Sequence, residues 1–166
     1  MRSVISWTPS ADGDEHLKRE GVAAEKIERD IMIDSFELFA PKIRSAGVAE
    51  RLGLANGQYG VVTLHRPSNV DDARLFASIV DRLIDIARDI PLVFPVHPRT
   101  RQRISDFGLA KRIEAARGIQ LTEPLSYIEF MSLVVDCRFA LTDSGGVQEE
   151  TSYLGIPCLT LRENTV

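Results

Sequence analysis

The pattern of apolar and polar residues changes period repeatedly between residues 59 and 166. Five short runs are almost continuously apolar and rich in β-branched residues, which predicts strands that are covered on both faces. These runs lie at residues 59–65, 91–96, 118–122, 137–142 and 156–161. Between them, apolar residues recur every three or four positions, as they do along one face of a helix. The pattern therefore predicts strands and helices in alternation.

Four helices are expected between these strands. The clearest has Ser68 or Asn69 as its N-cap, two aspartates in its first turn, and an apolar face that ends at Ala87. The others are expected at residues 100–107, 126–135 and 145–154. Alternating strands and helices favour parallel pairing through right-handed crossovers. The predicted fold class is therefore α/β, a doubly wound parallel sheet, in which ligands bind at the carboxyl ends of the strands.

The first third of the chain has a different pattern. Residues 11–20 are polar, and Gly21 is a residue type that ends helices. From Ile31 to about Leu52, apolar residues recur at helical spacing, so one helix is expected there, kinked at Pro41. Residues 53–60 are expected to form a linker. This opening is typical of the end of a preceding domain rather than of the start of one.

Composition and charge narrow the function classes. With 44% apolar and 27% charged residues, the chain has the composition of a soluble globular protein. The net charge of −4 gives no basic surface, so no nucleic-acid partner is expected. No apolar run reaches the roughly 18–20 residues of a membrane span, and no membrane association is expected. Cys137 and Cys158 lack CxxC spacing, so buried thiols of a cytoplasmic protein are expected rather than metal ligands.

The run Thr142-Asp-Ser-Gly-Gly-Val-Gln-Glu-Glu150 joins the fourth predicted strand to the last predicted helix. Glycines at the start of a helix leave backbone N–H groups accessible, and the helix dipole adds partial positive charge. Ser144, Gly145 and Gly146 are therefore a candidate anion site. Glu150 lies one turn further along the same face, where its carboxylate could accept hydrogen bonds from a ribose. The same residues could equally form a tight turn followed by two solvated glutamates.

Histidines and arginines follow two of the predicted strands. His65 and Arg66 come at the end of the first, and His97 comes at the end of the second, with Arg99 two residues later. Imidazole changes charge near neutral pH, so a histidine at the ligand edge can act as a general acid or base, or donate to a phosphate. Each histidine could equally well only satisfy neighbouring backbone groups. The occurrence of a histidine and an arginine after two different strands nevertheless favours a role in ligand binding.

Two further side chains are candidates for ligand contacts. Phe130 could lie against a nucleobase, although packing in the core is the more frequent role of such an aromatic residue. Arg162 follows the last predicted strand, where its planar guanidinium could pair with a phosphate or remain solvated.

These segments together resemble the UDP-N-acetylglucosamine 2-epimerases. Their order and spacing fit that family across nearly all of residues 59–166. The matching stretches are Val62-Thr-Leu-His-Arg-Pro-Ser-Asn-Val-Asp71, Pro95-Val-His-Pro98, residues 121–131, Thr142-Asp-Ser-Gly-Gly-Val-Gln-Glu-Glu150, Leu154-Gly-Ile-Pro157 and Leu161-Arg-Glu-Asn-Thr165. Weaker similarity covers Thr8-Pro-Ser10 and Arg19-Glu-Gly21.

The resemblance implies a two-domain enzyme of the glycosyltransferase-B type that binds UDP-N-acetylglucosamine between its domains. Its reaction removes the proton at C2 and eliminates UDP to give a glycal, and readdition on the other face gives UDP-ManNAc. The implied domain ranges are 1–30 as a remnant of the N-terminal domain, 31–58 as a connecting helix and linker, and 59–166 as an incomplete Rossmann-like UDP-binding domain. The implied ligand is UDP or UDP-N-acetylglucosamine, with no cofactor and no metal. The face left bare by truncation would favour a homodimer.

The resemblance also implies roles for individual residues. His65 takes the place of the family's catalytic-region histidine, and Glu150 that of its ribose ligand. Phe130 takes the place of the aromatic residue beside uracil. Ser144, Gly145 and Gly146 together match the family's diphosphate site. Arg66, His97 and Arg162 are retained as substrate-binding candidates from their positions at strand ends.

The chain departs from the family's pattern in ways that bear on activity. The family's acid/base carboxylates lie in its N-terminal domain, ahead of the segment covered here, so the chain is expected to bind UDP without epimerising alone. Pro98-Arg99-Thr100 follows His97 where several non-hydrolysing bacterial members have Leu-Asn-Pro, which weakens the expectation of activation by a second substrate molecule. A hydrolysing epimerase, the C-terminal domain of a glycosyltransferase and a non-catalytic UDP-binding module are the alternatives.

Overall fold

The structure, a computed structural model, describes residues 6–8, 19, 27–29 and 31–161. The chain divides into two compact units, residues 1–40 and 41–166. In the first unit, β1 (Ser6–Thr8) pairs in parallel with β2 (Ile27–Arg29), and Ser6 lies opposite Ile27. The domain ranges expected from the sequence stay a prediction. No helix within the described residues is both long and apolar enough to cross a membrane.

The second unit is built on a sheet of five parallel strands in the order β5-β4-β3-β6-β7. The strands are β3 (Gly60–Thr63), β4 (Leu92–Pro95), β5 (Ile119–Thr122), β6 (Phe139–Thr142) and β7 (Cys158–Thr160). Each lies within one of the five runs predicted from the sequence. The strand order reverses between β3 and β6, and this is the position at which sheets of this kind bind ligands.

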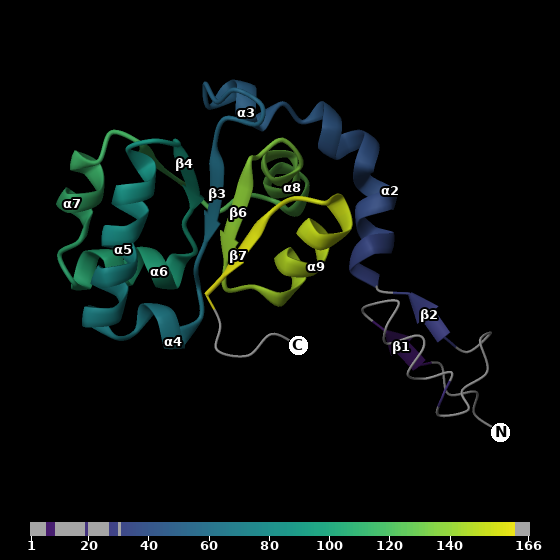
Figure 1. Cartoon of the computed structure of the whole chain (residues 1–166), viewed down its shortest axis with the longest axis horizontal. Coiled ribbons are helices and arrows are strands. Elements are labelled where there is room, and N and C mark those ends of the chain that lie inside the picture. Colours follow the sequence, from purple (N-terminus) through teal and green to yellow (C-terminus); the bar gives the residue numbers. More distant parts are fainter. Residues whose placement is uncertain (1–5, 9–18, 20–26, 30, 162–166) are drawn as a thin grey trace. The chain divides into compact units, whose positions relative to one another are not determined.

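Helices connect successive strands and cover both faces of the sheet. They are α4 (Pro67–Val70), α5 (Ala73–Ala87), α6 (Pro98–Asp106), α7 (Ala110–Ala115), α8 (Tyr127–Val135) and α9 (Gly145–Leu154). Figure 1 shows α5, α6 and α7 on one side of the strands and α8 and α9 on the other. The predicted α/β fold with a doubly wound parallel sheet is therefore confirmed.

The burial of the strands explains why their sequences are almost continuously apolar. All four residues of β4 are buried, as are the first three of β3. Val62 and Phe94 project from these strands into one hydrophobic cluster with Phe76 and Val80 of α5. The core on this face of the sheet is thus made by the apolar stripe of α5, which the sequence pattern predicted.

The prediction of a single helix from Ile31 to Leu52 is wrong. The structure has α2 (Ile31–Ser45) followed by a separate short helix, α3 (Val48–Arg51). Pro41 lies inside α2, so the proline does not end the helix. The break occurs at Gly47, whose φ of +58° lies in the left-handed region and cannot continue a right-handed helix.

The expected N-cap at Ser68 or Asn69 is also wrong. These residues lie inside the short helix α4, and α5 begins after Asp72, whose carboxylate accepts a hydrogen bond from the backbone N–H of Leu75 at 2.8 Å. An aspartate expected in the first turn is therefore the cap itself. The connection between β4 and β5 likewise contains a helix that was not expected, α7, which follows α6 after Gly108 at a φ of +66°.

Gly118 brings the start of β5 against the end of α5. A Cβ atom on this residue would overlap the carbonyl oxygen of Ala87, so the position has no room for a side chain. We expect Gly118→Ala to lower the free energy of unfolding by about 1–3 kcal/mol, the usual cost of overpacking, as measured by urea denaturation. Ala115→Ser, a change at an exposed position nearby, is the control and should alter stability by less than roughly 0.5 kcal/mol. Equal stability of Gly118→Ala and the parent chain would contradict the contact.

Candidate functional site

An open cavity lies at the carboxyl edge of the sheet, where the loops that follow β3, β4, β5 and β6 come together. Its volume is about 180 Å³. The lining residues are Thr63, His65, Pro95, His97, Pro124, Leu125, Phe130, Ser144 and Val147. Four residues singled out in the sequence, at positions 65, 97, 130 and 144, therefore meet at one place. Because β3 pairs with β6, this place is also where the strand order reverses.

Asp143 holds the loop after β3 against the end of β6. Its side chain is fully buried, and its Oδ2 accepts hydrogen bonds from the backbone N–H of His65 at 3.0 Å and of Arg66 at 2.8 Å. The side-chain amide of Asn69 donates to the same oxygen at 3.0 Å and also donates to the carbonyl oxygen of Leu161 at 2.9 Å. These donors offset the cost of burying a carboxylate. Asp143 was not among the site residues predicted from the sequence, although its position directly after a buried strand was a signal.

The two strand-end histidines lie side by side. Their ring centroids are 5.9 Å apart, and the rings are tilted by 43°. Nδ1 of His65 lies 3.0 Å from Oδ1 of Asp143. His97 is the N-cap of α6, and its Nδ1 accepts a hydrogen bond from the backbone N–H of Arg99 at 3.2 Å. The buried hydroxyl of Thr100 donates to the carbonyl oxygen of Leu64 at 2.5 Å, which fixes the start of α6 beside the end of β3.

Neither Arg66 nor Arg99 is among the described residues that line the cavity. The backbone N–H of Arg66 is used by Asp143. The guanidinium of Arg99 pairs with Asp71, to which Arg103 also donates at 3.0 Å. Hydrogen bonds from Arg99 and then from Arg103 lower the pKa of Asp71 from its ordinary value. Arg99 therefore holds α6 to the segment after α4 through Asp71.

The start of α9 forms one wall of the cavity. Ser144 is the N-cap, but its side chain makes no capping hydrogen bond, and its backbone N–H donates to Oγ1 of Thr142 at 2.9 Å. Gly145 and Gly146 are the first two residues of α9, and N–H groups at these positions have no acceptor inside a helix. Ser144 can thus offer its hydroxyl to an anion, whereas Gly145 and Gly146 can offer backbone N–H groups at the positive end of the helix dipole.

Glu150 is buried on the second turn of α9, with only 3% of its surface exposed. The hydroxyl of Tyr127 donates to its Oε1 at 2.8 Å. Burial first, and then this hydrogen bond, raises the pKa of Tyr127 above its ordinary value. Glu150 is not a lining residue of the cavity as described, and contact with a ribose stays a prediction. Arg162 lies outside the described residues.

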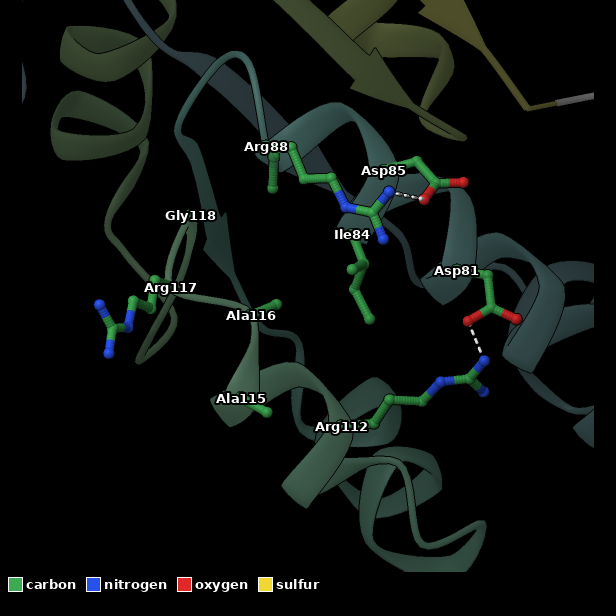
Figure 2. A pocket seen from close by; sticks show the side chains of 10 residues that line it. Asp81, Ile84, Asp85, Arg88, Arg112, Ala115, Ala116, Arg117 and Gly118 are labelled. Carbon is green, nitrogen blue, oxygen red and sulfur yellow. Dashed lines mark ion pairs between the residues drawn. The ribbon is translucent and has the colours of Figure 1, made fainter.

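A larger cavity of about 680 Å³ lies at the opposite edge of the sheet, where α5 and α7 end and the chain enters β4 and β5 (Figure 2). Two of its arginines are neutralised by aspartates, since Arg88 pairs with Asp85 at 3.3 Å and Arg112 pairs with Asp81. Figure 2 shows the side chain of Arg117 directed away from these pairs. The carboxyl ends of helices carry partial negative charge, which disfavours anions. This cavity is therefore the poorer candidate for a phosphate-bearing ligand.

Comparisons with known proteins agree with the resemblance seen in the sequence. Residues 2–166 match the family model described as UDP-N-acetylglucosamine 2-epimerase. The UDP-N-acetylglucosamine 2-epimerase of Methanococcus maripaludis is 31% identical over 98% of this chain and 46% of its own length. The UDP-2,3-diacetamido-2,3-dideoxy-D-glucuronate 2-epimerase of Pseudomonas aeruginosa is 37% identical over 98% of this chain and 45% of its own length.

A solved structure gives the same result in three dimensions. The UDP-GlcNAc 2-epimerase of Methanocaldococcus jannaschii, in complex with UDP-GlcNAc and UDP, matches with a TM-score of 0.76 and 32% identity over 98% of this chain and 46% of that one. The chain thus spans about half the length of the curated relatives it matches. Since the family model covers nearly every residue, this chain belongs to the UDP-N-acetylglucosamine 2-epimerase family.

Proposed function

We propose that this chain binds the UDP portion of a UDP-sugar at the carboxyl edge of its sheet, and that it serves as the nucleotide-binding part of a UDP-N-acetylglucosamine 2-epimerase. The observation that carries the proposal is the single cavity that unites His65, His97, Phe130 and Ser144 at the start of α9. A diphosphate would contact the N–H groups of Gly145 and Gly146 and the hydroxyl of Ser144. The uracil would stack on Phe130.

The relatives support UDP as the ligand. The matching solved structure holds UDP-GlcNAc and UDP. The relatives from M. maripaludis and P. aeruginosa differ in the sugar that they are named for, but both names include UDP and epimerisation at C2. The nucleotide is therefore the part of the substrate that we assign to this chain. UDP-N-acetylglucosamine is the proposed sugar nucleotide. The diacetamido glucuronate nucleotide for which the P. aeruginosa relative is named is the alternative.

Epimerisation needs a group that removes the proton at C2, and we propose that this chain does not supply it. Among the residues that the structure describes, none that lines the cavity carries a carboxylate. The two nearby carboxylates, Asp143 and Glu150, are buried and accept hydrogen bonds from neighbouring side chains or backbone groups. His65 is the candidate acid/base in the cavity, and the resemblance places the family's carboxylates in the other domain. Hydrolysis and transfer of the sugar remain alternative reactions for the same nucleotide site.

The first test is direct binding of UDP. We expect calorimetric titration to give a dissociation constant in the micromolar-to-millimolar range, because a cavity of about 180 Å³ is smaller than the roughly 300–1,000 Å³ of most ligand pockets. Ser144→Trp should abolish binding by filling the cavity, since Ser144 is one of its lining residues. Arg117→Ala, at the opposite edge of the sheet, is the matched control and should bind as the parent does. An absence of heat at millimolar UDP, with the chain folded, would refute the site.

The second test concerns Glu150 and the ribose. Glu150→Gln should weaken UDP binding about tenfold, because a hydrogen bond to a charged acceptor contributes about 1.5–3 kcal/mol. Glutamine keeps an oxygen for the hydroxyl of Tyr127, so the fold should be retained. The affinity for 2′,3′-dideoxyuridine diphosphate should be the same for the parent and the variant. An equal loss for both nucleotides would mean that Glu150 does not contact the ribose.

The third test is turnover. We expect proton NMR to detect no exchange of the C2 hydrogen of UDP-N-acetylglucosamine with solvent D₂O, and no UDP-ManNAc, when the pure 166-residue chain is incubated with substrate. The reason is that none of the described residues lining the cavity is a carboxylate. A full-length relative serves as the positive control. Solvent exchange that disappears in His65→Gln would show that the chain abstracts the proton by itself, which the proposal excludes.

A further inference from the structure

We propose that Asp143 is a positioning residue that fixes the protonation of His65, and that the cavity holds two imidazoles in opposite tautomers. His65 carries its proton on Nδ1 and presents Nε2 as an acceptor. His97 carries its proton on Nε2 and presents it as a donor. This inference deepens the proposed function, and it rests on that function only for the identity of the ligand.

The carboxylate of Asp143 determines the tautomer of His65. Nδ1 lies 3.0 Å from Oδ1, and the other partners of the two carboxylate oxygens within the described part of the chain are N–H groups that donate to them. A carboxylate so placed acts as an acceptor. A lone pair on Nδ1 would face a negatively charged oxygen at this distance, and the two would repel each other. The proton therefore stays on Nδ1. In other His–Asp pairs the carboxylate fixes the tautomer of the imidazole in the same way.

The backbone determines the tautomer of His97 in the opposite sense. Its Nδ1 accepts a hydrogen bond from the N–H of Arg99 at 3.2 Å. A backbone N–H can only donate, so Nδ1 must carry the lone pair. In the neutral ring the proton then lies on Nε2. The contact is part of the N-cap of α6, and the buried hydroxyl of Thr100 holds that helix start to β3.

The two rings line the same cavity with their centroids 5.9 Å apart. One therefore offers a hydrogen-bond acceptor and the other a donor within the reach of one ligand. On a nucleoside diphosphate sugar, the Nε2–H of His97 suits an anionic phosphate oxygen. The Nε2 lone pair of His65 suits a hydroxyl, an amide N–H or a proton in transfer.

Asp143→Asn is expected to reverse the tautomer of His65. Oδ2 of Asp143 receives three donors, from His65, Arg66 and Asn69, so the amide oxygen of an asparagine would take that position. Its NH₂ group would then occupy the position of Oδ1 and face Nδ1 of His65. Nδ1 must accept from that NH₂ group, and the ring proton moves to Nε2. His97 should not change, because its partner is a backbone amide of α6.

The test is long-range ¹H–¹⁵N correlation NMR of the imidazoles in the full chain, labelled on histidine and free of nucleotide. Spectra are recorded at a pH at which the ring signals no longer move, so that the rings are neutral. His65→Gln and His97→Gln assign the two signals of interest. Asp85→Asn, at the opposite edge of the sheet, is the matched control and should leave both tautomers as in the parent. Circular dichroism confirms that each variant is folded.

We expect the Nδ1–H form for His65 and the Nε2–H form for His97 in the parent, and a change of His65 alone to Nε2–H in Asp143→Asn. Either parent histidine in the other tautomer overturns the inference, and this measurement stands even if the variant does not fold. A folded Asp143→Asn variant whose His65 keeps its proton on Nδ1 overturns it as well.

Addition of UDP to the same samples then separates this inference from the proposed function. Shifts of the imidazole signals that saturate with UDP support the nucleotide site. Correct tautomers without any response to UDP would retain the role of Asp143 and overturn the nucleotide assignment.

Discussion

A buried carboxylate with fixed donors is the constraint that organises the second unit. An ion removed from water retains an effective penalty of several kcal/mol, so the fold must supply N–H groups at set positions around Asp143. β3 and β6 are neighbours in the sheet, and the backbone after β3 therefore meets Asp143 where β6 ends. The carboxylate of Asp143 therefore depends on the strand order, and it fixes the turn into α4 and the position of His65.

The strands of this unit could be predicted because a strand that is buried on both faces is apolar at nearly every residue, as β4 is. Helix ends were harder to predict, since several neighbouring residues could serve as caps and only the folded chain selects one. Asp72 rather than Ser68 or Asn69 caps α5 for this reason. The helix expected from Ile31 to Leu52 is interrupted at Gly47, because a residue in the left-handed region cannot continue a right-handed helix, whereas α2 continues past Pro41 although proline lacks an N–H donor.

The parallel topology explains which site residues could be predicted. His65, His97 and Ser144 follow three neighbouring strands, and the carboxyl ends of these strands necessarily meet. Asp143 was missed because the groups that give it a role lie 74 to 78 residues away in the sequence. The expectation for Arg99 was incomplete for a similar reason, since its distant partner Asp71 cannot be identified from a local motif.

The side-chain amide of Asn69 has a consequence for cooperativity. One NH₂ group joins Asp143 and Leu161, which are 74 and 92 residues further along the chain. Closing loops of this size carries an entropy cost that local contacts do not repay. The segment after β3, which carries His65, is therefore expected to reach its final geometry only when β6 and β7 have joined the sheet. Unfolding of β7 would remove the acceptor that Leu161 offers to Asn69, so local unfolding of this edge strand and loss of order around His65 are expected to occur together.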